Sequence, residues 1–237
     1  QNYSHNIIQE PQLIGPSLMA DYEVEKHSRL NRIPDRGHYD EKTVHSIIDS
    51  ALICHLGFIE NGRPFVIPCI HGREGRTLYL HGAKASRLMN EGGSGKDLCI
   101  TFTHIDGIVL ARSLFHSSMN YRSVVAFGKG HILEADGEKI HALNVVTEGL
   151  CRGRWEGGRT PTKKELEATS VIAVDIEHAG AKIRTGGAND DEGDLSGPWW
   201  AGVLPVETKI HPPIPSEDLR IDPAPPQHVL DRVGDVL

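Results

Sequence analysis

Alternating apolar and polar residues recur along the chain and predict a fold built mainly from β-strands. Residues 171–177 alternate clearly, and residues 98–104 follow the same pattern. A period of two places one set of side chains in the core and the other set outside it. Asn61-Gly62 separates two apolar runs, 51–59 and 64–71, and this dipeptide strongly favours a hairpin turn.

Three more strands are predicted farther along, at 77–81, 108–112 and 121–135. Gly128 and Gly130 in the last of these indicate a bulge or a close approach of backbone. The charged, Gly-containing segment 72–76 is predicted as a loop, and Asp106-Gly107 as a turn.

Helical patterns lie between the strands. Asp40 is a suitable N-cap for a helix over 41–50, whose apolar residues fall on one face. Thr162 and Glu165 have the spacing of a capping box at the start of another helix. Two further helices are predicted at 84–91 and 138–150.

Tight connections between antiparallel strands favour a closed or partly closed barrel over a doubly wound sheet. We therefore predict a mainly β protein with inserted helices and six to seven antiparallel strands. The domain would span 34–210, after an N-terminal arm (1–33) and before a Pro-rich C-terminal tail (211–237). The arm is a candidate for wrapping a partner subunit.

Composition narrows the function classes. The net charge of −7 over 237 residues argues against non-specific nucleic-acid binding, and no apolar run is long enough for a membrane span. Four widely spaced cysteines indicate reduced thiols, and residues 1–10 lack an export pattern, so we expect a cytoplasmic protein. A local group of basic residues could still bind one anion: Arg73, Arg76, Lys84 and Arg87.

The segment 77–87 carries the clearest candidate chemistry. It is predicted as a strand that ends at His81-Gly82, followed by a short helix with Ser86 and Arg87 near its start. A hydroxyl, a guanidinium and free backbone N–H groups suit a phosphate. There is no Rossmann, Walker or nucleophile-elbow motif in the sequence, which leaves a different kind of nucleotide site.

Other polar and aromatic residues have two interpretations each. The run Tyr121-Arg122-Ser123 suits hydrogen bonding to a ligand, or is an ordinary polar hairpin. Trp200 could form a wall beside a flat ligand, or close the end of a barrel. His71 and His116 could donate protons near neutral pH, or be structural; the histidines show no metal-binding spacing, so no metal site is expected.

Five segments, taken together, resemble one family. They are 54–58, 64–68, 78–83, 120–128 and 200–203, and they occur in the order found in the FMN-binding split-barrel superfamily, the pyridoxamine 5′-phosphate oxidase-like proteins. Within it the chain most resembles the flavin-nucleotide-binding branch that includes Nim-type nitroimidazole reductases. The resemblance covers about residues 33–205 and implies a split β-barrel.

The resemblance also implies a homodimer with FMN at the subunit interface. It assigns cofactor binding to Val66, Ile67, Pro68, His81, Gly82, Ala83, Ser86, Arg87, Tyr121, Arg122, Ser123 and Trp200. Many relatives carry a lysine beside the Ser-Arg pair, whereas Leu88 follows Arg87 here. Phosphate binding would therefore depend more heavily on Arg87.

The first hypothesis is an FMN-dependent oxidoreductase acting on a small planar or electron-poor molecule, with His71 or His116 as proton donor. The alternatives are a non-catalytic flavin-binding or sensor protein, a haem-binding protein, and a barrel that works without flavin. The fold by itself does not choose among these.

Overall fold

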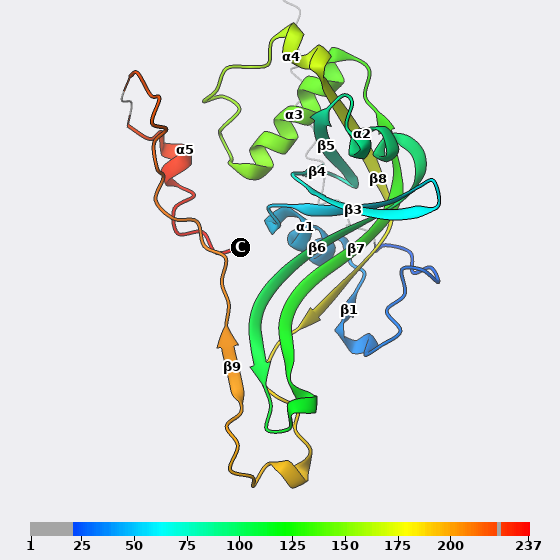
Figure 1. Cartoon of the computed structure of the whole chain (residues 1–237), viewed down its shortest axis with the longest axis vertical. Coiled ribbons are helices and arrows are strands. Elements are labelled where there is room, and N and C mark those ends of the chain that lie inside the picture. Colours follow the sequence, from blue (N-terminus) through cyan, green and yellow to red (C-terminus); the bar gives the residue numbers. More distant parts are fainter. Residues whose placement is uncertain (1–20, 222–223) are drawn as a thin grey trace, which may run out of the picture.

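The computed structural model describes residues 21–221 and 224–237. Nine strands in this part of the chain form one antiparallel sheet that curves around a core without closing (Figure 1). The strands are β1 (Gly37–His38), β2 (Cys54–Glu60), β3 (Arg63–Cys69), β4 (Gly72–Glu74), β5 (Thr77–Ala83), β6 (Ser94–Leu110), β7 (Ser118–Ile132), β8 (Thr169–Arg184) and β9 (Gly202–Pro205).

The strand order β3-β2-β6-β7-β8-β5-β4 makes β3 and β4 the two edges of the main path. The additional strands β1 and β9 pair with β8 and β6 respectively. An antiparallel sheet with two open edges confirms the prediction of a mainly β split barrel. The number of strands exceeds six to seven because β1, β4 and β9 are short strands that the sequence pattern did not reveal.

Two predicted connections are wrong. The predicted loop 72–76 contains β4, which pairs with β5 through Gly72↔Tyr79 and Glu74↔Thr77. The predicted turn at Asp106-Gly107 is the interior of β6, where the register with β7 shifts between Ile105 and Gly107. Turn-forming residues here produce a bulge because β7 continues alongside and holds the strand in place.

The helices are α1 (Glu41–Ser50), α2 (Arg87–Gly92), α3 (Asp136–Leu150), α4 (Lys163–Ala168) and α5 (Gln227–Leu230). The start of α1 is as predicted, since the Asp40 side chain accepts a hydrogen bond of 2.8 Å from the Thr43 amide. The capping box of α4 is also present. No helix in the described ranges combines the length and the apolar character needed to cross a membrane.

The main core lies between α1 and the concave side of the sheet. Val44, Ile47 and Ile48 of α1 are buried against strand residues such as Phe102 and Val124. On another side of the barrel, α3 packs along β4 and β5. The Gly72 backbone lies so close to α3 that a Cβ there would come within 2.6 Å of the Val146 Cα.

The described part of the N-terminal arm packs against the sheet of its own chain. The His27 ring contacts Phe127 and His178 edge-on, with ring centroids 4.8 and 5.0 Å apart. Residues 1–20 of the arm lie outside the described residues. The arm's predicted role in a dimer stays a prediction.

The Pro-rich tail doubles back on itself. An isolated bridge joins Lys209 to Val236, and the Ile210 amide donates to the Asp235 carbonyl at 3.0 Å. The tail contains α5, which lies near the end of α3 in Figure 1. The Cys151 thiol, just after α3, donates to the His228 carbonyl at 3.5 Å.

Candidate functional site

The segment from His81 to Arg87 lies at the junction of β5 and α2. The Ser86 hydroxyl accepts a hydrogen bond of 3.2 Å from the Met89 amide, which fixes the start of the helix. A Cβ on Gly82 would lie 3.3 Å from the Met89 side chain, so glycine allows α2 to pack closely over β5. The predicted strand, His-Gly and short helix are therefore present, although α2 begins three residues later than predicted.

His81 has an unsatisfied buried atom at this junction. Its Nδ1 is buried and has no hydrogen-bond partner within the described part of the chain. Burial lowers the pKa of the imidazole below its usual value, which favours the neutral ring at neutral pH. Because a buried polar atom without a partner costs about 1–3 kcal/mol, this nitrogen fits a site that a polar ligand completes.

The Arg87 guanidinium lies between α2 and the β2–β3 hairpin. Its Nε is 3.0 Å from Glu60 Oε2, and its Cζ lies 4.4 Å from the centre of the Phe65 ring. The side chain is half exposed. Arg87 can therefore exchange the Glu60 carboxylate for another anion without leaving the aromatic ring.

The structure also explains the residue after Arg87. Leu88 is 7% exposed and belongs to the hydrophobic core. Position 88 therefore faces away from Arg87, toward the interior of the barrel. A lysine at this position would place its charge in the core, so the leucine fits the packing of this chain.

The β3 strand offers backbone groups to a ligand. In the described part of the chain it is an edge strand with β2 as its single partner, and Val66 and Pro68 are exposed while Ile67 packs against the core. Proline has no N–H to donate, so in an edge strand it occupies positions whose N–H would point away from the partner strand. Pro64, Val66 and Pro68 share that side by alternation, which leaves the Val66 N–H as the donor of this stretch.

The residues Tyr121, Arg122 and Ser123 lie apart from this cluster. They are on β7, three strands away from β3 in the sheet, or about 14 Å at the usual strand spacing. The Arg122 guanidinium is held by both carboxylate oxygens of Asp106, at 2.9 to 3.2 Å, and by the Leu237 carbonyl at 3.2 Å. Within one chain they do not join the His81–Arg87 cluster.

Trp200 and His116 occupy other regions. Trp200 is 64% exposed just before β9, and its ring lies over the Gly202 backbone. His116 ends a short 3₁₀ turn (Leu114–His116) between β6 and β7, with Nε2 3.4 Å from Asp191 Oδ2. Figure 1 shows this connection at the opposite end of the molecule from α2.

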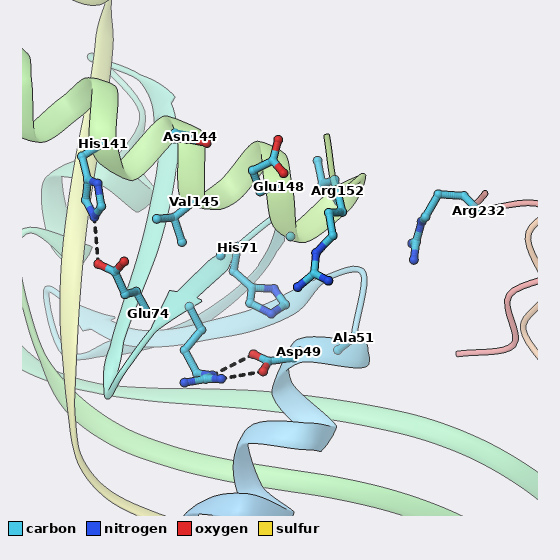
Figure 2. Close-up of a pocket in the computed structure, with 14 residues that line it drawn as sticks. Asp49, Ala51, His71, Glu74, His141, Asn144, Val145, Glu148, Arg152 and Arg232 are labelled. Carbon is cyan, nitrogen blue, oxygen red and sulfur yellow. Dashed lines mark hydrogen bonds and ion pairs between the residues drawn. The ribbon is translucent and has the colours of Figure 1, made fainter. Parts of the chain in front are cut away.

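His71 lies beside a separate cavity of about 510 Å³ between α1, β4 and α3 (Figure 2). Its Nε2 is 3.0 Å from the Ile48 carbonyl, and its ring contacts Phe102 edge-on at 4.9 Å. Its Nδ1 is buried without a partner in the described ranges. The two histidines predicted as proton donors are therefore in different parts of the molecule.

Two arginines that line this cavity with His71 were not predicted from the sequence. Arg152 follows α3, and Arg232 follows α5 in the C-terminal tail. No local motif marks either arginine, because the cavity combines His71 with residues 81 and 161 positions farther along the chain. Only the folded tail brings Arg232 to the end of α3.

Comparisons with known proteins agree with the fold. The family model described as pyridoxamine 5′-phosphate oxidase matches residues 40–183. No curated protein sequence matches the chain.

Three solved structures are similar to the chain. Flavocytochrome Anf3 from Azotobacter vinelandii is 36% identical over 89% of this chain and 98% of its own, with a TM-score of 0.83. An FAD- and haem-binding protein from Mycobacterium smegmatis is 29% identical over 84% of this chain and 98% of its own, with a TM-score of 0.80. A protein from Bacteroides thetaiotaomicron, assigned to 5-nitroimidazole antibiotic resistance, shares the fold at 24% identity and a TM-score of 0.53, covering 62% of this chain and 86% of its own. The split barrel, the family match over residues 40–183 and the 36% identity to flavocytochrome Anf3 together show that this chain belongs to the pyridoxamine 5′-phosphate oxidase family of flavin-binding split barrels.

Proposed function

We propose that this protein is a flavin-dependent oxidoreductase that binds FMN beside β3, β5 and α2. The observation that carries the proposal is the Nδ1 of His81, which has no partner in the described ranges, at the same β5–α2 junction as the half-exposed Arg87. When bound, the flavin supplies hydride or single-electron transfer. The Val66 N–H would orient the flavin ring, and Ser86 and Arg87 would hold the phosphate.

The choice of FMN follows from the charge of the cluster. Arg87 is the guanidinium placed where α2 meets the β2–β3 hairpin, and it suits a single terminal phosphate. The two most extensively matched structures above are described as a flavocytochrome and as an FAD- and haem-binding protein. Chromatography of the flavin released from the purified protein distinguishes FMN from FAD.

We propose further that the protein works as a homodimer. Ile59 and Val66, on the outer face of β2 and β3, are 62% and 66% exposed, and Ile105 on β6 is 39% exposed. A second copy would cover these apolar side chains. It would also bring its own Tyr121, Ser123 and Trp200 to the flavin. Within one chain these three residues lie apart from the site beside β3, β5 and α2.

The substrate would be a small planar molecule that stacks against the flavin ring. Trp200 of a second copy would provide an aromatic wall for it. Turnover of reduced nicotinamide with electron-poor acceptors tests this role. Bound flavin without turnover would favour the flavin-binding or sensor alternative.

The first test measures the affinity for FMN in two variants with opposite expectations. Arg87→Gln should raise the Kd at least about tenfold, since hydrogen bonds to charged groups contribute about 1.5–3 kcal/mol. Glu60→Gln should lower the Kd, because it frees Arg87 from its carboxylate partner. Quenching of flavin fluorescence on titration gives both values.

Lys96→Gln is the matched control. Lys96 is paired with Glu91 at 2.7 Å near α2 but belongs to neither β3 nor the His81–Arg87 junction. Its substitution removes the same charge and should leave the Kd unchanged. An Arg87→Gln protein that binds FMN as tightly as the wild type would contradict the assignment of Arg87 to the FMN phosphate.

A second candidate function is a flavocytochrome that binds haem as well. The observation favouring it is the similarity to two proteins described as binding haem or as flavocytochromes, over 84% and 89% of this chain. The chain supplies 14 histidines as possible axial ligands. A Soret band that appears on adding haemin, survives desalting and is lost on replacing one histidine supports this candidate; a protein that never retains haemin excludes it.

A further inference from the structure

The cavity between α1, β4 and α3 is separate from the His81–Arg87 cluster. It holds about 510 Å³, within the range of small-molecule sites. Asp49 and Ala51 line it on the α1 side, Val145 and Glu148 on the α3 side. Figure 2 shows Val145 of α3 and Arg152 of the segment after it projecting toward α1.

His71 provides an unused hydrogen-bond acceptor beside this cavity. The residue is 5% exposed, and Nε2 contacts the Ile48 carbonyl at 3.0 Å, so Nε2 carries the proton. Nδ1 is then an acceptor, and it has no partner among the described residues. Burial lowers the pKa of the ring, which keeps it neutral. A ligand at this position must therefore donate a hydrogen bond.

Two guanidinium groups line the same cavity. Figure 2 shows Arg152 projecting toward His71, with Arg232 approaching from the C-terminal tail. Arg152 has no hydrogen bond or ion pair within the described ranges, whereas Arg232 contacts Asp235 at 2.8 Å. Because Arg232 already has a carboxylate partner, Arg152 is the guanidinium of this pair that still has its hydrogen-bonding groups available to an anion in the cavity.

Both arginines are held in place by specific contacts. The Glu148 carboxylate accepts hydrogen bonds from the Gly153 and Trp155 amides, at 2.6 and 2.8 Å, and so fixes the loop that carries Arg152. On the tail, the ring of His228 lies against Gly157, where a Cβ would come within 2.5 Å of it. This contact positions the segment that carries Arg232.

The remaining charges limit the kind of anion. Arg73 is already neutralised by both oxygens of Asp49, at 2.5 and 2.7 Å. Glu74 and Glu148 add two more carboxylates to the lining. A doubly charged phosphate would be repelled by these acids, so a singly charged carboxylate fits better, and arginine binds carboxylates in a bidentate manner.

We propose that this cavity binds a small hydroxycarboxylic acid, with its carboxylate between Arg152 and Arg232 and its hydroxyl donating to Nδ1 of His71. The site is independent of flavin binding. It uses a tail residue, so it exists only when residues 227–237 are folded against the end of α3.

The experiment compares 2-hydroxybutyrate with butyrate, which differ only in the hydroxyl, by ligand-observed NMR on the full chain. The hydroxy acid should bind about 2- to 12-fold more tightly, the range expected for one hydrogen bond of 0.5–1.5 kcal/mol. This comparison tests His71 without altering a buried residue. Arg152→Gln and Arg232→Gln should each weaken both acids at least fivefold.

Arg154→Gln is the matched control, because Arg154 lies in the same loop but contacts the Gly157 carbonyl and does not line the cavity. It should leave both affinities unchanged. Equal binding of the two acids, absence of binding at tens of millimolar, or the same loss in all three variants overturns the proposal. Displacement of the acid by stoichiometric haemin would also overturn it, since the cavity would then accommodate the propionates of a haem.

Discussion

At the scale of single residues, two buried ring nitrogens lie at the candidate sites. Nδ1 of His81 and Nδ1 of His71 have no partner among the described residues, nor does Nε2 of His228 in the tail, and the first two lie in different parts of the fold. The sequence singled out His81 as a cofactor-binding residue by resemblance and His71 as a candidate proton donor, but it could not show that one ring nitrogen of each would be buried without a partner. Burial and the absence of a partner are properties of the folded surroundings.

Three histidines should make the stability of the protein depend on pH. Burial lowers the pKa of His45, His71 and His81. The unfolded chain, with imidazole pKa values near 6.5, then binds more protons than the folded one below this pH. Their stabilising effect is complete above about pH 6.5 and is lost as the pH falls through the lower, folded values.

We expect the urea midpoint of the ligand-free protein to be lower at pH 5.5 than at pH 7.5. Carboxylates with lowered pKa values, such as those of Asp40 and Glu148, act in the same direction but at more acidic pH. Equal midpoints at the two pH values would contradict the prediction. Imidazole signals followed by NMR over the same range assign the effect to individual rings.

At the scale of elements, local signals predicted starts and turns better than strand ends. The Asp40 cap, the capping box of Thr162 and the Asn61-Gly62 turn all depend on contacts within a few residues. The predicted turn at Asp106-Gly107 failed because β6 is held by long-range pairing with β7. Tertiary pairing can convert a turn signal into a bulge.

Gly128 tests this role of long-range pairing. A Cβ at this position would lie 1.9 Å from the Asp175 carbonyl oxygen, at the register shift between β7 and β8. Gly128→Ala should therefore destabilise the protein by about 3 kcal/mol or more. Chemical denaturation followed by circular dichroism measures the change.

Gly137→Ala is the comparison within the same protein. Gly137 lies in the first turn of α3, and a Cβ there meets nothing within 4 Å. The substitution should be neutral or stabilise by up to about 1 kcal/mol. A Gly128→Ala protein as stable as Gly137→Ala would show that the bulge tolerates a side chain.

At the scale of the whole molecule, the exposed apolar positions on β2, β3 and β6 favour a second copy. The resemblance assigns cofactor binding to residues of β3 and of β7, which lie three strands apart in the sheet. They would meet at one flavin only across such an interface. The order of motifs along the chain predicted the fold but did not show how far apart the candidate site residues lie within one chain. The structure places Tyr121, Arg122 and Ser123 away from the His81–Arg87 junction, and His71, His116 and Trp200 in other regions.

Ile105→Arg should convert the proposed homodimer into a monomer of 26.0 kDa and weaken FMN binding at the same time. Ile105 lies opposite Tyr121 in the ladder of β6 and β7, and a buried unpaired charge there would be costly. Light scattering after size-exclusion chromatography gives the mass. Ile214→Arg, at a 93% exposed position in the tail, is the control and should change neither property.

The sequence by itself determined the strand-rich fold and the strand, turn and helix of the His81–Arg87 segment, because these depend on alternation, caps and turns within short windows. The family was indicated by the order of five segments along the chain. Only the tertiary structure decided that Arg122 is held by Asp106 and that Arg152 and Arg232 line one cavity with His71. These partners are separated by 16 to 161 positions in the chain. Local preferences carry no information about such pairs, which form when the sheet curves and the tail folds back against α3.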